Sequence, residues 1–246
     1  MHSALPVVLE RGAAIFLFAL SIFMTGVHST LIGMAARRTG RSGFGAAIAT
    51  AAFLSLWLGF GLLTGDPANF ARGKAVSLPQ VLVVGYTPMV LAVLLLFVWR
   101  PLRELNAATP SSWLIRVQAY RMAGLIFIFP FLTFGVIPAA FAVPAALGDF
   151  ITGLLVPFIA RAVDHRAPHA LLWATLWNLF GILDLVIAPI TAFALRANIV
   201  ALYPLVLVPL FLGPPLGILT HIWSLRNLAT NQHPAATVLD RERAAA

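Results

Sequence analysis

Two aspartates stand inside otherwise apolar runs, where an ionised carboxyl group is costly. Asp149 lies in the run ALGDFITGLL and Asp184 in WNLFGILDLVIA, whereas the other six of the eight acidic residues lie in polar segments. A carboxylate in an apolar span must be paired, protonated or in contact with water, and such groups often mark ion pathways. The pair therefore predicts a proton or cation site. The structural alternative is a helix cap or an interhelical bond, and the cap is favoured for Asp149, which follows Pro144.

Four further residues are expected near this site. Trp177 falls on the same helical face as Asp184, and Asn178 is adjacent to it. Tyr120 and Arg121 begin another apolar span, in the run RVQAYRMAG. For Arg121 the favoured alternative is a side chain that extends to the membrane surface.

Two histidines, His28 and His221, lie in the first and last apolar spans. At similar depth on neighbouring helices, two such imidazoles can ligate a b-type haem or a metal, or relay protons. The alternative, which we favour, is two separately hydrogen-bonded histidines, because no carboxylate in the sequence is positioned to support a metal ligand.

The composition indicates that most of the protein's surroundings are lipid. The 246 residues are 61% hydrophobic and 10% charged, whereas soluble domains carry about 25% charged residues. The net charge of +8 comes from short loops without interleaved aromatic residues, so nucleic-acid binding is not expected. The absence of cysteine excludes disulfides, thiolate metal sites and a cysteine nucleophile.

The predicted fold is all-α, an integral membrane bundle of seven transmembrane helices. Apolar stretches long enough to cross a bilayer, at about 20 residues each, lie near 12–36, 44–64, 78–99, 117–141, 144–162, 168–194 and 199–225. Residues 1–226 would form a single membrane domain, and residues 227–246 a polar tail.

Basic residues predict the orientation. The loops after the first, third and fifth spans, together with the tail, hold twelve of the sixteen, and the opposite side holds four: Arg11, Arg72, Lys74 and Arg196. By the positive-inside rule, the N-terminus is outside and the C-terminus cytoplasmic.

Prolines are expected to distort two spans. Pro130 and Pro138 should bend the fourth. Pro204, Pro209 and the run GPPLG at 213–217 should kink or unwind the seventh and free backbone carbonyls there.

The seven-helix outline with an outside N-terminus matches the microbial rhodopsins, which attach retinal to a lysine of the seventh helix. The only lysine of this chain is Lys74, in a predicted outer loop, so a retinal Schiff base is excluded.

Three runs, QAYRMAGLIF, PAAFAVPAALGDFITGLLVPFIA and WNLFGILDLVIA, resemble a pattern of uncharacterised bacterial integral membrane proteins. The resemblance covers about Gln118–Ala188. It implies a bacterial inner-membrane location and brings no activity with it.

The leading hypothesis is a proton- or cation-coupled transporter or channel-like protein that uses the two aspartates, and a membrane enzyme is the less favoured class. The alternatives are a haem-binding subunit that uses the two histidines, and an accessory subunit of a membrane redox complex. The expected partners are the lipid bilayer and either a second copy or a larger membrane complex, which would dock on the row of small residues at 43–59.

Overall fold

The computed structural model describes residues 7–64, 78–128, 132, 135, 137–197 and 212–230. Within these ranges the regular elements are helices and no strand occurs, which confirms the all-α prediction. In chain order they are α1 (Val7–Arg38), α2 (Gly43–Thr64), α4 (Leu78–Val98), α5 (Arg100–Ala108), α6 (Ser111–Arg116), the 3₁₀ helix η1 (Val117–Phe127), α8 (Ala139–Asp164), α9 (Ala170–Ala194) and α10 (Gly213–Thr230).

Several helices have the length and apolar character of membrane spans. Four qualify in the described part of the chain: Phe18–Arg38, Gly43–Gly61, Ala139–Asp164 and Ala170–Ala194. A fifth is added if Gly85–Val98 and Arg100–Ala108, which are bent by 91°, count as one span. Large apolar side chains face outward, among them Leu56 at 75% and Ile22 at 72% exposure. These features are compatible with a membrane protein.

The fourth predicted span, 117–141, differs from the observed helices. Its first part is the 3₁₀ helix η1, which ends at Phe127, and Pro138, which has extended backbone angles, precedes α8 at Ala139. Pro138 therefore starts a helix and does not bend one, because proline lacks the N–H that a helix interior requires. Pro130 and residues 198–211, which include Pro204 and Pro209, lie outside the described residues.

The run 213–217 lies where the described part of the last helix begins. Leu212 is π-helical and residues 213–217 are α-helical, so the expected unwinding does not occur there, and Pro214 and Pro215 occupy the first turn of α10. Proline is tolerated there because the first N–H groups of a helix have no partner within that helix.

The predicted connection 100–116 is helical. Trp99 has extended backbone angles, and α5 leaves α4 at 91°. Pro101 cannot donate a backbone N–H to the α4 ladder. The Arg103 side chain instead donates to the Phe97 carbonyl at 3.3 Å. The bend thus follows from a proline and a side chain that replaces its missing donor.

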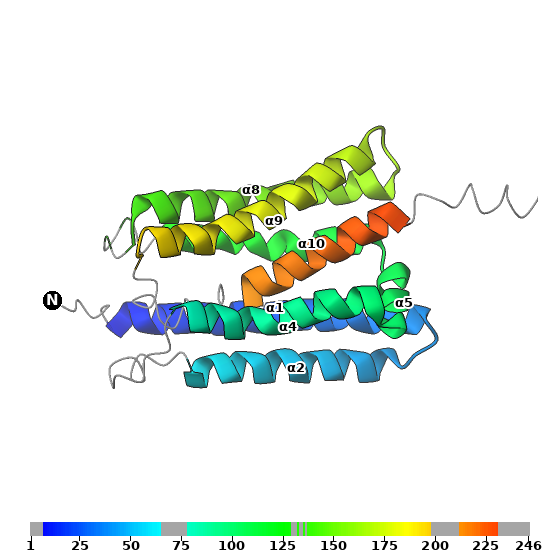
Figure 1. Ribbon diagram of the computed structural model, residues 1–246, viewed down its shortest axis with the longest axis horizontal. Helices are drawn as coiled ribbons and strands as arrows, with labels where there is room; N and C mark the ends of the chain where they lie inside the picture. The colour runs from blue at the N-terminus through cyan, green and yellow to red at the C-terminus, as the bar shows by residue number, and fades with distance from the viewer. Residues whose placement is uncertain are drawn as a thin grey trace, which may run out of the picture.

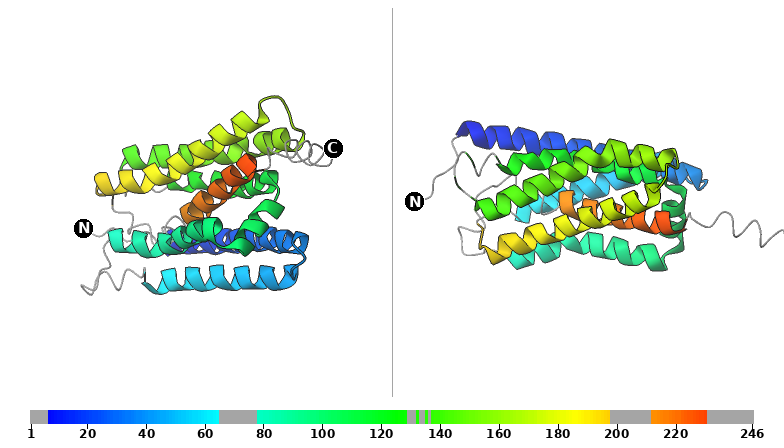
Figure 2. Two further views of the ribbon diagram at one scale, coloured as in Figure 1. Left: turned by 45° about the vertical axis from the view of Figure 1, so that its right-hand side comes forward. Right: turned by 90° about the horizontal axis from the view of Figure 1, so that it is seen from above.

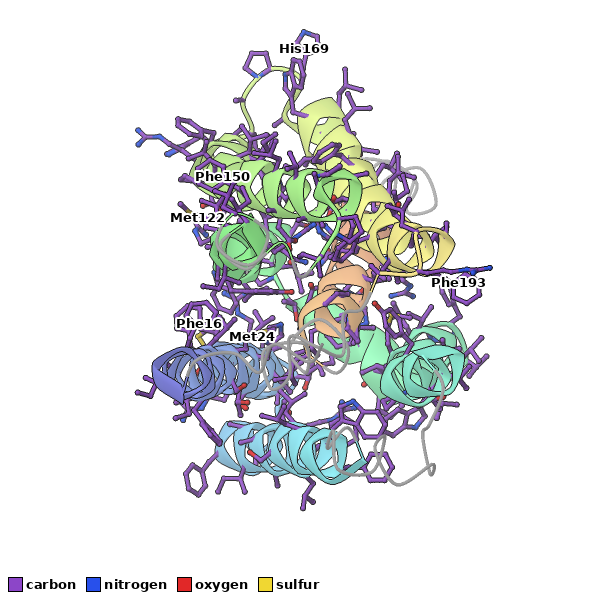
Figure 3. All side chains as sticks on the ribbon, turned by 90° about the vertical axis from the view of Figure 1, so that its left-hand side faces the viewer. Phe16, Met24, Met122, Phe150, His169 and Phe193 are labelled. Carbon is purple, nitrogen blue, oxygen red and sulfur yellow. The ribbon has the colours of Figure 1, made fainter. Side chains whose placement is uncertain are left out.

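The helices are arranged in layers with α10 in the interior (Figure 1). Helices α8 and α9 lie on one side of α10, α1 and α4 lie on the other, and α2 packs on the outer face of α1. Figure 2 gives the same arrangement from two further directions. Along the bundle axis, α10 is surrounded by the other helices (Figure 3), and its Gly217, His221 and Ser224 are buried. This interior helix and its neighbours position the candidate site.

The turn at 39–42, α5, the α8–α9 turn and the end of α10 lie at one end of the molecule (Figure 1). These segments carry most of the basic residues that predicted the orientation. Arg41 and Arg100 both pair with Glu104, at 2.8 and 2.7 Å, and Arg116 pairs with Asp164. We refer to this region as the basic end.

Candidate functional site

Arg121 is the centre of the buried polar site. It projects from η1, and its side chain is only 1% exposed. A 3₁₀ helix has three residues per turn, so Gln118, Arg121 and Gly124 form one row along η1. The expected extension of the Arg121 side chain to a surface is wrong, because both aspartates of the apolar runs hold it inside.

Two carboxylates from different helices bind the Arg121 guanidinium. Its Nε donates to Asp149 Oδ1 of α8 at 2.6 Å, and its Nη2 donates to Asp184 Oδ2 of α9. Asp149 is ten residues into α8, so the capping interpretation is wrong. An ion pair of this kind gives each buried charge the partner that desolvation demands.

The two aspartates lie at the same level of the bundle. Each is ten residues from the end of its helix, at Ala139 in α8 and at Ala194 in α9, which corresponds to about 15 Å. Helix α8 begins five residues before the predicted span 144–162, which places Asp149 further from the start of its helix. The Asp149 side chain is 22% exposed and the Asp184 side chain 13% exposed, whereas the Arg121 side chain is only 1% exposed.

A chain of hydrogen bonds leads from Arg121 along α10. Arg121 Nη1 is 3.2 Å from His221 Nε2, and His221 Nδ1 is 2.9 Å from Asn178 Oδ1. Asn178 Nδ2 in turn donates to Ser224 Oγ at 3.1 Å and to the Ala174 carbonyl at 2.7 Å. The arginine can only donate, so the consistent assignment is a neutral His221 with its proton on Nδ1.

Trp177 and Tyr120 support the site without binding the guanidinium. The Trp177 ring lies 4.9 Å from the His221 ring, and its Nε1 donates to the Thr152 carbonyl at 3.1 Å. The Tyr120 hydroxyl donates to the Gly213 carbonyl of α10 at 2.8 Å. Trp177 therefore covers His221, and Tyr120 holds the start of α10 against η1.

The carbonyls expected to be free at 213–217 are occupied at both glycines. Gly213 accepts from Tyr120, and Gly217 accepts from Gln118 Nε2 at 2.9 Å. Gln118 Nε2 also lies 2.5 Å from Thr220 Oγ1. Side chains of η1 thus satisfy the carbonyls in the first turns of α10, and neither glycine carbonyl is available to a cation.

The two histidines have different surroundings. His28 of α1 bonds the Met24 carbonyl through Nδ1 at 2.7 Å, and its ring lies 6.2 Å from that of Tyr120. Among the described residues, its buried Nε2 has no hydrogen-bond partner. Both ring nitrogens of His221 are engaged, so the arrangement does not favour haem ligation by this pair. Within the described residues, no group of three His, Asp or Glu side chains is placed to hold a metal.

Three glycines that sequence reasoning left out give the charged groups their space. A side chain at Gly148 would overlap the Asp184 carboxylate, one at Gly181 the His221 ring, and one at Gly124 the Asp149 carboxylate. The spacing could have indicated two of these glycines. Gly124 is three residues from Arg121 and Gly181 is three residues from Asp184, so each lies on the same face of its helix as a charged residue. Ser224, which ends the hydrogen-bond chain, was also missed.

The centre is not electrically balanced. It contains one guanidinium, two carboxylates and, by the hydrogen-bond assignment, a neutral imidazole. With both carboxylates ionised, the formal charge of the centre would be −1. Such a charge is expensive at low dielectric, so this state would favour the gain of one positive charge.

The sequence model of a protein family described as a domain of unknown function, DUF8737, matches residues 78–229. The match covers more than half of the chain, from α4 to the end of α10, and includes every residue that binds Arg121. It agrees with the expected resemblance to an uncharacterised family. No curated protein and no solved structure matches the chain.

Proposed function

The chain belongs to the family of the domain of unknown function DUF8737, and we propose that it is a transporter or channel-like membrane protein driven by protons or cations. The site is the Arg121 centre, at which Asp149 and Asp184 accept the ion. His221 contacts the guanidinium from the interior helix α10, and Asn178 of α9 orients the His221 ring. Trp177, Tyr120 and the neighbouring glycines shape its surroundings.

The proposed setting is the inner membrane of a bacterium. Seven spans, with the N-terminus outside and the C-terminus in the cytoplasm, account for the apolar runs and for the basic end. The exposed apolar side chains of the long helices support contact with lipid tails. The protein would act in the bilayer as a homo-oligomer or within a larger membrane complex.

One observation carries the functional proposal: two carboxylates share one buried guanidinium, so the group has a formal charge of −1 when both carboxylates are ionised. Ionisable groups at membrane depth are rare and are associated with ion and proton pathways. The 22% exposure of Asp149 gives this carboxylate access to its surroundings, while the arginine between the two carboxylates stays sealed.

A proton fits the centre better than a metal cation. The guanidinium already occupies the space between the two carboxylates, and its Nη1 also donates to the Gly181 carbonyl at 3.2 Å. Protonation of Asp184 would neutralise the centre and weaken the bond that ties α9 to η1, while Asp149 keeps α8 attached. The proton would thereby shift the balance between two arrangements of α9 relative to η1.

The test uses the full chain, purified and reconstituted in vesicles. A potassium gradient with valinomycin sets the membrane potential, and an enclosed pH-sensitive dye reports proton entry. We expect proton entry with the wild type and at least a tenfold lower rate with Asp184→Asn. Sodium and lithium are tested in parallel as ligands that raise the unfolding temperature.

The matched control is Glu104→Gln, which removes an exposed carboxylate at the basic end. It should leave both readouts unchanged. If Asp184→Asn matches the wild type in proton entry and in the thermal response to each cation, the proposal fails.

A further inference from the structure

A groove that is separate from the Arg121 centre runs along α1. It encloses about 390 Å³, with Gly26, Thr30 and Met34 of α1 on one side and Trp113, Arg116 and Val117 on the other. No residue that binds the Arg121 guanidinium lines it. The proposed ion site therefore leaves this groove unexplained.

The groove has the length and the openness of a slot for one acyl chain. Gly26, Thr30 and Met34 follow one another at four-residue spacing, so they form one row that rises about 12 Å along the helix. One leaflet of a bilayer is of similar depth, about half of the roughly 30 Å hydrocarbon core. All three residues are exposed, so the slot faces the surroundings of the protein.

The groove ends in positive charge. Arg116 lines it, and Arg38, one turn beyond Met34, places its guanidinium 4.4 Å from the centre of the Trp113 ring. Arg116 pairs with Asp164, whereas Arg38 donates to the Ala108 carbonyl at 3.4 Å and forms no ion pair with any described residue. The stacking on Trp113, which lines the groove, holds Arg38 beside it without a carboxylate partner among the described residues.

From this combination we propose that the groove binds an anionic phospholipid. The acyl chain lies between α1 and the segment formed by α6 and the start of η1, and the phosphate contacts Arg38 and Arg116. An apolar slot flanked by Arg38, which has no carboxylate partner among the described residues, and by Arg116, which shares its charge with Asp164, is complementary to an amphiphile with an anionic head. The inference rests on the proposed membrane location and is independent of the proposed ion site.

A helix of a second copy is the competing occupant, because Gly26 and Thr30 are small residues at the spacing that favours helix contact. Such a helix would need an acidic residue at its end to match Arg38 and Arg116. A phospholipid brings this charge with it, so charge complementarity favours the lipid.

The experiment measures lipid binding to the full purified chain. Native mass spectrometry counts retained lipids, and thermal unfolding is followed with added phosphatidylglycerol or phosphatidylcholine of identical chains. We expect phosphatidylglycerol to be retained and to raise the unfolding temperature more than phosphatidylcholine. Glycerol phosphate, which has the charge without the chain, should not reproduce the effect.

Two sets of variants test the two halves of the site. Gly26→Leu fills the groove, and a Cβ there meets nothing within 4 Å, so the helix accepts it. It should abolish lipid retention, whereas Gly59→Leu, at an equally open glycine of α2, should not. Arg38→Gln with Arg116→Gln should weaken phosphatidylglycerol binding about 30-fold, equivalent to roughly 1 kcal/mol for each arginine. Arg161→Gln, an exposed arginine outside the groove, serves as the charge control.

Three results would overturn the lipid site. They are equal responses to the two phospholipids, equal lipid retention by Gly26→Leu and Gly59→Leu, and a loss of dimers in Gly26→Leu without a loss of lipid. The last result would identify the groove as an interface between copies. Asp184→Asn is expected to keep the lipid, so failure of the ion site and failure of the lipid site can be told apart.

Discussion

At the scale of single residues, polar groups of the Arg121 centre lie against glycines of neighbouring helices. Asp184 of α9 lies against Gly148 of α8, and His221 of α10 lies against Gly181 of α9. Because these glycines have no side chains, the helices can bring their polar groups to one point. Glycine therefore contributes here through the room it leaves and not through a special backbone conformation.

The first prediction concerns Gly148→Ala. The added methyl group would overlap the Asp184 carboxylate, so either the ion pair or the α8–α9 contact must shift. We expect a loss of about 1–3 kcal/mol of unfolding free energy, as for overpacked interiors, measured by thermal unfolding. Gly59→Ala, where a Cβ has open space, should be neutral or slightly stabilising. Equal behaviour of the two variants would contradict the packing described here.

The second prediction concerns the charge balance. Arg121→Gln leaves two carboxylates facing each other without a cation, and removal of one partner of a buried ion pair costs about 3–5 kcal/mol. Combination with Asp149→Asn and Asp184→Asn removes the unpaired charges and should recover most of this loss. Chemical denaturation in detergent compares the single and the triple variant. A triple variant as unstable as the single one would show that shape, and not charge, dominates the centre.

At the scale of elements, α10 is fixed to the rest of the bundle at both of its ends. Near its start, Tyr120 and Gln118 of η1 bond its carbonyls. Near its end, Asn106 of α5 donates to the Trp223 carbonyl at 3.0 Å and accepts from Arg226 at 2.9 Å. The short helices α5 and η1 thus hold the helix that carries His221.

The third prediction therefore concerns Asn106→Ala. Asn106 is fully buried, and its loss leaves a carbonyl and a guanidinium without their partner. We expect a cost of about 1–3 kcal/mol and faster hydrogen exchange in α5 and in the last turns of α10. Glu104→Gln, an exposed position of the same helix, should change the stability by no more than about 0.5 kcal/mol. Unchanged exchange in α10 would rule out the coupling of the two helices.

At the scale of the whole molecule, charge is distributed unevenly between the two ends. The turn between α8 and α9, where His169 points away from the bundle (Figure 3), belongs to the basic end. Arg196 follows α9 at the opposite end. If the long helices cross a bilayer, this asymmetry sets the orientation, because basic loops remain in the cytoplasm.

The fourth prediction tests that orientation. The chain has no cysteine, so a single introduced cysteine gives an unambiguous label. His165→Cys, in the α8–α9 turn, should react with a membrane-impermeant maleimide only after the cells are opened. Ala194→Cys, at the other end of α9, should react in intact cells. The reverse pattern would mean that the basic end faces outward.

Much of the site was predictable from residue type alone. Charged and polar residues in apolar runs must find partners, and this singled out Asp149, Asp184, Arg121, Asn178 and His221, all of which the structure joins in one network. Which residue would pair with which was not predictable. The Arg121 side chain could also extend along its own helix to the surface. Only the lateral packing of η1 against α8 and α9 decides that it lies inside the bundle and not at the surface.

The sequence by itself determined that this chain is helical, that its helices are apolar enough for lipid, and that Asp149 and Asp184 need partners inside apolar runs. These properties are set by hydropathy and charge along the chain, which act locally. Only the tertiary structure decided that a 3₁₀ helix carries Arg121, that Pro214 and Pro215 are part of α10, and that glycines on three helices leave room for one guanidinium between two carboxylates. Those features depend on how closely helices approach one another, and that distance arises from packing between segments far apart in the sequence.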